Sequence, residues 1–503
     1  MKKIIYLPLD ERPCNYEFPY RIFDRSQFKI IRPPKTIMGN KKTPAPYHLI
    51  RKWLQDYAGI SDGAVIAVDT LLYGGIIPSR MHNLDVSELK ERMALIQTIK
   101  KEYPQLVIYA YQLIMRTPQY NSADEEPDYY QDWGRDIFCW GYLRHLSENK
   151  TLTEKQQEEL KKINIPEQYL QDYLKRREIN LSLNMAILDY VAAGTIDFLV
   201  IPQDDASPYG WTALDQNAVR MHIRKKNLLS RVYLYPGADE AGGVLMARML
   251  CRLQSFTPKI YIKYPSPAAL TLIPSLEDRY LDTMVKYQIM AAGGIIVNSL
   301  KEADTVYIVN AAADRMLSSF SGEAPGRGIE VLRNGVEAIE FARYAASLSK
   351  AVIVGDITYG NGSPPDIYHL LNNGGLLFSV AGFAGWNTAA NSVGSALAQG
   401  ISYLVNGPSL NHYDFLVSRY IEDIGYCGNV RQKVMAEVLP LYPQYNYFDV
   451  KEEEGEMAGI IKRLLNDFLQ KEMPEIFHHG KIVRLRMPWR RLYEIDLAAK
   501  YLK

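Results

Sequence analysis

The chain has 503 residues, of which 47% are hydrophobic and 23% are charged, and its formal net charge is +1. This length allows a large buried core in two or three structural units, and the composition is that of an ordinary globular protein. The near-zero charge gives no reason to expect a nucleic acid or an anionic membrane surface as a partner. The four cysteines are far apart and show no zinc or redox spacing.

The N-terminal segment lacks the apolar stretch and small-residue cleavage site of a signal peptide. No apolar run approaches the roughly 20 residues that a membrane-crossing helix needs. We therefore expect a cytoplasmic protein with no membrane partner. The sequence does not predict an oligomeric state.

Eight short apolar runs, most of them followed by polar residues, are predicted to be β-strands. In chain order they cover residues 4–9, 64–68, 106–111, 198–202, 232–235, 305–309, 351–355 and 376–382. Helical patterns separate them: residues 87–101 are amphipathic, and residues 151–193 are helical with one break at Pro166. Such an alternation of strands and helices is typical of a mainly parallel sheet.

Eight strands favour an α/β protein built on a (β/α)8-like (TIM) barrel. We expect residues 1–237 to form the first part of the barrel, with a helical insertion at 151–193, and residues 303–410 to form the remainder. Residues 238–302 are expected to be an α/β subdomain, and residues 411–503 a C-terminal helical region with a final strand. The alternative is a multi-layer arrangement of doubly wound α/β domains, since the subdomain could begin a parallel sheet of its own.

Two adjacent acids, Asp204 and Asp205, follow the apolar run that ends at Pro202. Neighbouring carboxylates repel each other, so the pKa of one tends to rise, and an acid beside a carboxylate is the pair that glycosidic cleavage needs. Asp is also a favoured helix N-cap, so the pair could instead cap the following helix. We favour catalysis, because one Asp would suffice for a cap, and predict Asp204 and Asp205 to be catalytic.

Polar residues also follow the other predicted strands, and the carboxyl ends of parallel strands meet at one edge of a sheet. The resulting candidates for substrate binding are Asp10, Glu11, Arg12, Asn15, Asp69, Tyr73, Arg80, Arg116, Tyr209, Asp239, Glu240, Asn310 and Asp356. The arginines among them could clamp an anionic group or hold a catalytic acid, and structural pairing with nearby acids is an equal alternative. We predict that one cavity collects six strand-end side chains, namely Asp10, Asp69, Asp204, Asp205, Asp356 and Asn387.

The eight histidines include no HExxH motif, so no metal and no cofactor is assigned. A magnesium or manganese site made only of carboxylates stays open as an alternative, because these ions take oxygen ligands. Its candidate ligands are Asp69, Asp204, Asp239 and Asp356.

Four motifs spread along the chain suggest a family. They are Leu7-Pro-Leu-Asp-Glu-Arg-Pro-Cys-Asn15, Asp69-Thr-Leu-Leu-Tyr-Gly-Gly75, Gln203-Asp-Asp-Ala-Ser-Pro-Tyr-Gly210 and Gly382-Phe-Ala-Gly-Trp-Asn-Thr-Ala-Ala-Asn391. With these motifs the chain resembles a bacterial family known as domain of unknown function 4127, over nearly its whole length to Pro488-Trp489-Arg490. The family name implies no activity.

The Asp204–Asp205 pair after the predicted fourth barrel strand, with the later Trp386-Asn387-Thr388 loop, also resembles the retaining β-N-acetylglucosaminidases that include the O-GlcNAcases. In those enzymes the acetamido oxygen of the substrate is the nucleophile. The resemblance implies that Asp204 orients and stabilises the acetamido group and that Asp205 is the general acid and then the base. It also implies that Asn387 and Asn391 contact the sugar or its acetamido group and that Trp386 forms a wall of the pocket.

We therefore expect a glycoside hydrolase that cleaves a β-linked N-acetylhexosamine by a retaining, substrate-assisted mechanism, acting on a small-molecule or glycan substrate. One alternative is a metal-dependent hydrolase or phosphoryl-transfer enzyme that uses the same carboxylates. Another is a carbohydrate-binding protein without activity, whose acids and tyrosines only hold the ligand.

Overall fold

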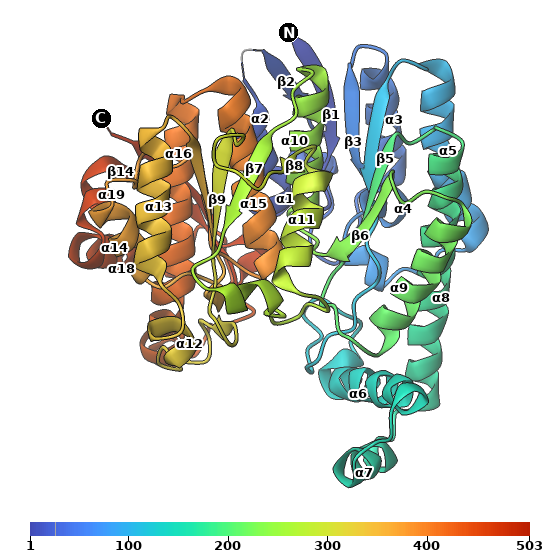
Figure 1. Cartoon of the computed structure of the whole chain (residues 1–503). Helices are drawn as coiled ribbons and strands as arrows, with labels where there is room; N and C mark the ends of the chain where they lie inside the picture. The colour runs from blue at the N-terminus through green and yellow to red at the C-terminus, as the bar shows by residue number, and fades with distance from the viewer. Residues whose placement is uncertain (26, 503) are drawn as a thin grey trace. The chain divides into compact units, whose positions relative to one another are not determined.

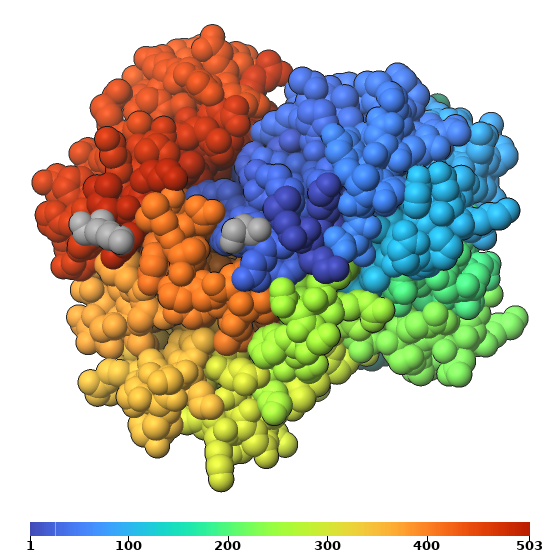
Figure 2. Space-filling model, turned by 90° about the horizontal axis from the view of Figure 1, so that it is seen from above, coloured from blue at the N-terminus to red at the C-terminus, as the bar shows by residue number. Residues whose placement is uncertain are grey.

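The computed structural model describes residues 1–25 and 27–502 and shows two compact units, between which the chain passes several times (Figure 1). Unit 1 comprises Met1–Glu11, Arg25–Gly242 and Leu276–Asp278. Unit 2 comprises Arg12–Asp24, Gly243–Ser275 and Arg279–Lys503. Met1 is exposed, and Figure 2 shows the N-terminal residues, in dark blue, at the molecular surface.

Unit 1 is built on a six-stranded parallel sheet with the strand order β2-β1-β3-β4-β5-β6. Its strands are β1 (Lys2–Leu7), β2 (Phe28–Ile31), β3 (Gly63–Ala67), β4 (Val107–Tyr111), β5 (Phe198–Gln203) and β6 (Val232–Pro236). Every residue of β3 and β5 is buried, which is the pattern of strands covered on both faces. The direction of strand addition reverses between β1 and β3, so this pair forms the topological switch point of the sheet.

Helices connect these strands. They are α3 (Tyr47–Ala58), α4 (Val68–Tyr73), α5 (Val86–Glu102), α6 (Tyr130–Asn149), α7 (Glu154–Lys162), α8 (Glu167–Ala192) and α9 (Trp211–Lys225), with short 3-10 turns η1 (Lys35–Ile37) and η2 (Pro78–Arg80). The helices predicted at 87–101 and 151–193 are confirmed by α5 and by the pair α7 and α8. Thr153 and Gln156 form a capping box at the start of α7, and Pro166 separates the two helices as the N-cap of α8.

Unit 2 contains a five-stranded parallel sheet with the order β13-β11-β9-β7-β8. Its strands are β7 (Lys259–Lys263), β8 (Ile295–Ile296), β9 (Thr305–Asn310), β11 (Ala351–Asp356) and β13 (Gly382–Ala384). Taken from β8, the order is the same as that of the first five strands of unit 1, with the reversal between β7 and β9. Strands β7 and β8, from the segment expected to be a subdomain, thus share a sheet with β9, β11 and β13.

Two small pairs complete the strands of unit 2: parallel β10 (Leu317–Ser318) with β12 (Tyr359–Gly360), and antiparallel β14 (Gly480–Arg486) with β15 (Asp496–Tyr501). Its helical elements are α1 (Pro13–Tyr16), α2 (Phe18–Phe23), η3 (Pro267–Thr271), α11 (Leu281–Ala291), α12 (Arg327–Glu330), α13 (Gly335–Ser347), α14 (Asp366–Asn373), α15 (Ala389–Asn406), α16 (Leu410–Arg419), η4 (Tyr420–Val430), α17 (Arg431–Lys433), η5 (Val434–Val438), η6 (Leu439–Leu441), α18 (Glu456–Glu472), α19 (Pro474–His479) and η7 (Pro488–Arg490). Helix α10 (Ala241–Leu253) begins in unit 1 and continues in unit 2. The 11-residue η4 is a π-helix, a form that is rare and often found at functional sites.

The α/β class with parallel sheets agrees with the prediction, but a closed barrel is not shown. In the part of the chain that the structure describes, β2 and β6 are the edges of one sheet and the remaining expected barrel strands belong to another. An alternating strand–helix pattern fits both architectures, because it determines that strands are parallel and buried and leaves open whether the edges meet. Each sheet has one reversal in the direction of strand addition, which is the kind of strand order expected for the alternative prediction of several doubly wound α/β units.

Two local corrections concern the strands. The predicted strand at 376–382 is wrong for most of its length, because residues 377–379 form turns and the strand covers only Gly382–Ala384. Strand β2 was not predicted, because its four residues follow the polar stretch around Arg25 and form too short an apolar run to stand out.

Candidate functional site

Asp204 and Asp205 lie in the turn after β5 and do not cap a helix. Helix α9 begins only at Trp211, and its N-cap is Gly210, which provides no side-chain cap. The N-cap alternative is therefore wrong. Asp205 also has a positive φ of 46°, a strained conformation for a non-glycine residue that is often retained at functional sites.

Arg80, which lies between β3 and β4 in the chain, binds Asp204 of the acid pair. It lies in the short turn η2, and its side chain is buried. Its Nη2 donates a hydrogen bond of 2.8 Å to Oδ2 of Asp204, and its Nη1 lies 3.1 Å from both Glu125 Oε2 and Glu126 Oε1. The guanidinium group of Arg80 thus bridges Asp204 to Glu125 and Glu126, two acids of the loop that precedes α6.

Arg116, which follows β4, binds the same acids from a second direction. Its Nε lies 2.8 Å from Glu126 Oε1 and its Nη2 lies 2.9 Å from Glu125 Oε2. Its Nη1 lies 3.4 Å from Asp205 Oδ2 and 3.7 Å from Asp204 Oδ2. We call the set of these six side chains the acid–arginine cluster: Arg80, Arg116, Glu125, Glu126, Asp204 and Asp205.

The cluster contains four carboxyl groups but only two guanidinium groups. Burial, together with the charge of Asp204, raises the pKa of Asp205 to about 7, and the opposing charges of Arg116 and Arg80 only partly offset this effect. Asp205 therefore takes up a proton more readily than an ordinary aspartate, and such a proton would reduce the surplus of negative charge in the cluster. The side chain of Asp204 remains 18% exposed, so the pair can be reached from solvent.

Asp69 is a second buried acid at the same edge of the sheet. It lies in the first turn of α4, directly after β3, and its Oδ2 accepts a hydrogen bond of 2.9 Å from the backbone N–H of Leu113. Burial raises its pKa to about 7, although the Leu113 N–H and the charge of Arg80 oppose the rise. Burial and the charge of Asp69 also raise the pKa of Tyr73, whose buried hydroxyl has no hydrogen-bond partner within the described residues.

Replacing Asp69 with asparagine is expected to alter the pH dependence of stability. The unfolded carboxyl loses its proton near pH 4, whereas the folded one keeps it to about pH 7, so the parent loses stability as the pH rises through this window. The slope is up to about 1.4 kcal/mol per pH unit for one proton. The asparagine side chain carries no such proton, so the Asp69→Asn variant should gain stability relative to the parent between pH 5 and pH 7 in urea titrations.

The matched control for this measurement is Asp189→Asn, because the Asp189 side chain is 63% exposed. The difference between this control and the parent should change little with pH. A constant difference between Asp69→Asn and the parent across the same range would contradict a raised pKa at Asp69.

The remaining predicted residues of unit 1 lie after β1, β5 and β6. The acids are Asp10, Glu11, Asp239 and Glu240, and all but Glu11 are buried. Glu11 accepts a hydrogen bond of 2.8 Å from the backbone N–H of Lys41, and Glu240 accepts one of 3.0 Å from that of Ala238. Tyr209 packs its ring against side chains of α6, so its observed contacts are structural.

In unit 2, two pairs of predicted residues contact each other. Asn310 and Asp356 end neighbouring strands, and Asn310 Nδ2 donates a 2.9 Å hydrogen bond to Asp356 Oδ1. Asn387 Nδ2 donates a 2.6 Å hydrogen bond to Asn391 Oδ1. Asn391 also forms a capping box with Thr388 at the start of α15, which gives it a structural role.

Three further predicted residues are buried within unit 2. The backbone N–H of Trp386 donates a 2.8 Å hydrogen bond to Ser392 Oγ, and the indole is 8% exposed. The guanidinium carbon of Arg12 lies 4.8 Å from the ring centre of Trp489, an arrangement that favours a cation–π interaction. Asn15 is fully buried.

The structure brings some of the predicted residues together and assigns others to different units. Arg80, Arg116, Asp204 and Asp205 form one cluster, and the charge of Arg80 also acts on Asp69. Of the six side chains predicted to share a cavity, unit 1 contains Asp10, Asp69, Asp204 and Asp205, and unit 2 contains Asp356 and Asn387. The single cavity stays a prediction.

Sequence reasoning missed two groups of charged residues that are buried or partly buried. Glu125 and Glu126 lie in a polar, proline-containing segment that has the composition of a solvated loop, so no local signal marked them. In and before the π-helix, Arg419 forms ion pairs with Glu422 and with Asp423, the latter at 3.0 Å. The i, i+3 and i+4 spacing of these three residues was a readable signal of side-chain pairing on a helix.

The alternative of an all-carboxylate metal site stays a prediction. Oδ2 of Asp204 already accepts a hydrogen bond from Arg80, a cation that competes with a metal ion for the same oxygen. Across residues 1–25 and 27–502, no three or more His, Cys, Asp or Glu side chains are grouped as metal ligands.

Comparison with protein families shows which family the chain belongs to. The family whose description is "Protein of unknown function (DUF4127)" matches residues 4–498 of the chain. The chain belongs to the DUF4127 family. The motifs around Asp10, Asp69, Asp204 and Asn387 thus lie in a member of this family, as the sequence suggested.

A search of curated proteins found no match, so the resemblance to β-N-acetylglucosaminidases is not supported. No helix within the described part of this DUF4127 protein is both long and apolar enough to cross a membrane.

Proposed function

We propose that the acid–arginine cluster is the active site of a glycoside hydrolase. The observation that supports this proposal is the geometry of two adjacent carboxyl groups: Asp204 accepts a hydrogen bond of 2.8 Å from Arg80, and beside it Asp205 is buried, which together with the charge of Asp204 raises the pKa of Asp205 to about 7. A proton donor beside a carboxylate is the chemical requirement for acid-assisted cleavage of a glycosidic bond.

In this mechanism Asp205 donates its proton to the glycosidic oxygen as the bond to the leaving group breaks. It then accepts a proton from the water that completes hydrolysis. The substrate is a β-linked N-acetylhexosamine whose acetamido oxygen attacks the anomeric carbon. Asp204 stabilises the positive charge that develops on the acetamido group, and Arg80 fixes the orientation of Asp204.

The charge of the cluster favours this substrate over a phosphorylated one. Both arginines are already bound to carboxyl groups, and the acids outnumber them by four to two. A phosphate group would therefore meet an excess of negative charge, whereas a neutral sugar with a positively charged transition state would be stabilised.

A panel of nitrophenyl glycosides, assayed with and without EDTA, tests the proposal. We expect release of nitrophenol from at least one β-N-acetylhexosaminide, and we expect EDTA to leave the rate unchanged. Hydrolysis that requires an added divalent metal ion, or hydrolysis of nitrophenyl phosphate alone, would contradict the glycosidase proposal. Failure to hydrolyse any sugar, including chitin-type oligosaccharides, would also contradict it.

A further inference from the structure

The carboxyl edge of the second sheet contains an acid and an arginine that are linked without forming an ion pair. Asn310, the last residue of β9, lies between them. Its Oδ1 accepts a 2.7 Å hydrogen bond from Arg333 Nη1, and its Nδ2 donates a 2.9 Å hydrogen bond to Asp356 Oδ1. In the described part of the chain, neither Arg333 nor Asp356 forms an ion pair, although each carries a group that normally seeks one.

Only one oxygen of Asp356 is satisfied. Its Oδ1 accepts hydrogen bonds from Asn310 and from the side chain and backbone of Thr358, at 2.6 Å and 3.2 Å. Its Oδ2 is buried and has no partner within the described residues, and the whole residue is 0% exposed. An unpartnered carboxylate oxygen costs free energy unless a donor, best of all a cation, binds to it.

Arg333 lies at the other end of this series of hydrogen bonds, and part of its guanidinium group has no hydrogen-bond partner among the described residues. Its Nε donates to the backbone carbonyl of Ile329 at 2.9 Å, and its Nη1 binds Asn310. Its Nη2 makes no hydrogen bond to any residue that the structure describes, and the side chain is half-buried. A guanidinium with a free edge is suited to bind a carboxylate.

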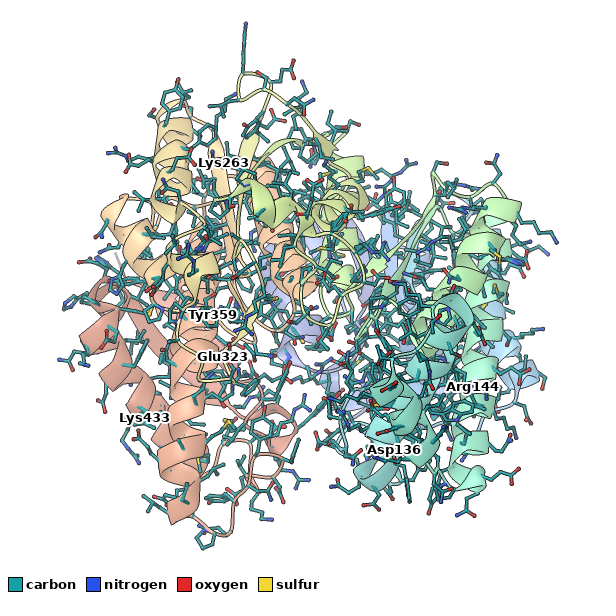
Figure 3. All side chains as sticks on the ribbon, turned by 60° about the horizontal axis from the view of Figure 1, so that its bottom comes forward. Asp136, Arg144, Lys263, Glu323, Tyr359 and Lys433 are labelled. Atoms are coloured by element: carbon teal, nitrogen blue, oxygen red, sulfur yellow. The ribbon has the colours of Figure 1, made fainter. Side chains whose placement is uncertain are left out.

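We propose that this edge of unit 2 binds a small zwitterion of the α-amino acid class, with its ammonium group on Asp356 Oδ2 and its carboxylate on Arg333. The rigid amide of Asn310 keeps the two protein charges apart, so that each can meet the opposite charge of one ligand. Figure 3 shows this side of the molecule, with Tyr359, the neighbour of Thr358, labelled. Because Oδ2 is closed off from solvent, the ammonium group reaches it only when this edge opens locally.

This proposal does not depend on the proposed hydrolase function and is tested by binding. The twenty common L-amino acids are screened by thermal shift against the full-length protein, and hits are measured by calorimetry. Each hit is compared with the amine that lacks its carboxylate and with the acid that lacks its ammonium group. We expect at least one amino acid to bind and both truncated analogues to bind about tenfold or more weakly, because each loses one charged hydrogen bond.

Arg333→Gln should weaken binding of the amino acid by about ten- to a hundredfold, because a neutral amide replaces the charged partner. Asp356→Asn should do the same, and a normal unfolding curve will show that either variant is folded. The control is Arg343→Gln on α13, whose side chain is 62% exposed and pairs with Glu340. Absence of binding by any amino acid, unchanged affinity in Arg333→Gln, or Arg333-dependent binding of neutral sugars instead would overturn the proposal.

Discussion

Asp205→Asn should lower turnover of the best glycoside substrate by about 10²- to 10⁴-fold, which is the usual contribution of a general acid. The loss should be greatest for substrates with poor leaving groups, since these depend most on protonation of the glycosidic oxygen. Asparagine has nearly the same shape as aspartic acid but cannot transfer the proton. Steady-state rates on alkyl and nitrophenyl glycosides of the same sugar measure this dependence.

The pH profile of the parent provides an independent readout of the same group. Because Asp205 must be protonated to act as the acid, kcat/KM should fall tenfold per pH unit above about pH 7. Asp205→Asn should lose this alkaline limb. In Asp204→Asn the pKa of Asp205 should decrease, because the neighbouring negative charge is removed, so the limb should move to lower pH.

The matched control is again Asp189→Asn, the same substitution at an exposed position of unit 1. It should retain parental rates and the parental pH profile. Near-parental turnover in both Asp204→Asn and Asp205→Asn, on a substrate that the parent cleaves, would show that the acid pair is structural.

Arg419→Met is expected to destabilise the protein by about 3–5 kcal/mol at pH 8, the usual cost of removing one partner of a buried ion pair. Arg419 is fully buried, and its loss would leave the carboxyl groups of Glu422 and Asp423 without their cation. Burial already raises the pKa of Glu422 to about 8 and that of Asp423 to about 6. At pH 5 both acids take up a proton, so the destabilisation should be clearly smaller.

Urea titrations at pH 5 and pH 8 measure this difference in the free energy of unfolding. Arg343→Met, at an exposed arginine paired with Glu340, is the control and should cost at most about 1 kcal/mol at either pH. An Arg419→Met penalty that is the same at both pH values would show that lost packing, and not the uncompensated acids, determines the effect. The ring of Phe18, 3.9 Å from the guanidinium carbon, is the packing partner that would explain such a result.

The sequence by itself determined the α/β class, most of the strands and the acid pair at the end of one of them. Strand β5 illustrates why: an unbroken apolar run that ends in Asp204 and Asp205 specifies a buried strand with charges at its end, and both properties are local. The membership of the chain in the DUF4127 family was likewise visible in short motifs. The prediction of a strand at 376–382 was wrong because an apolar run can equally form buried turns.

Only the tertiary structure decided which strands share a sheet and which charges meet. The pairing of β7 with β9, and not the closure of a single barrel, depends on contacts between distant segments that have no local sequence period. The same is true of Glu125 and Glu126, which have the composition of an exposed loop yet bind Arg80 and Arg116 in a partly buried cluster. Long-range packing sets the burial of each charge, and burial shifts its pKa, so a raised pKa in the acid pair could be suspected from the sequence, but only the folded chain shows that Asp205 is the more buried of the two.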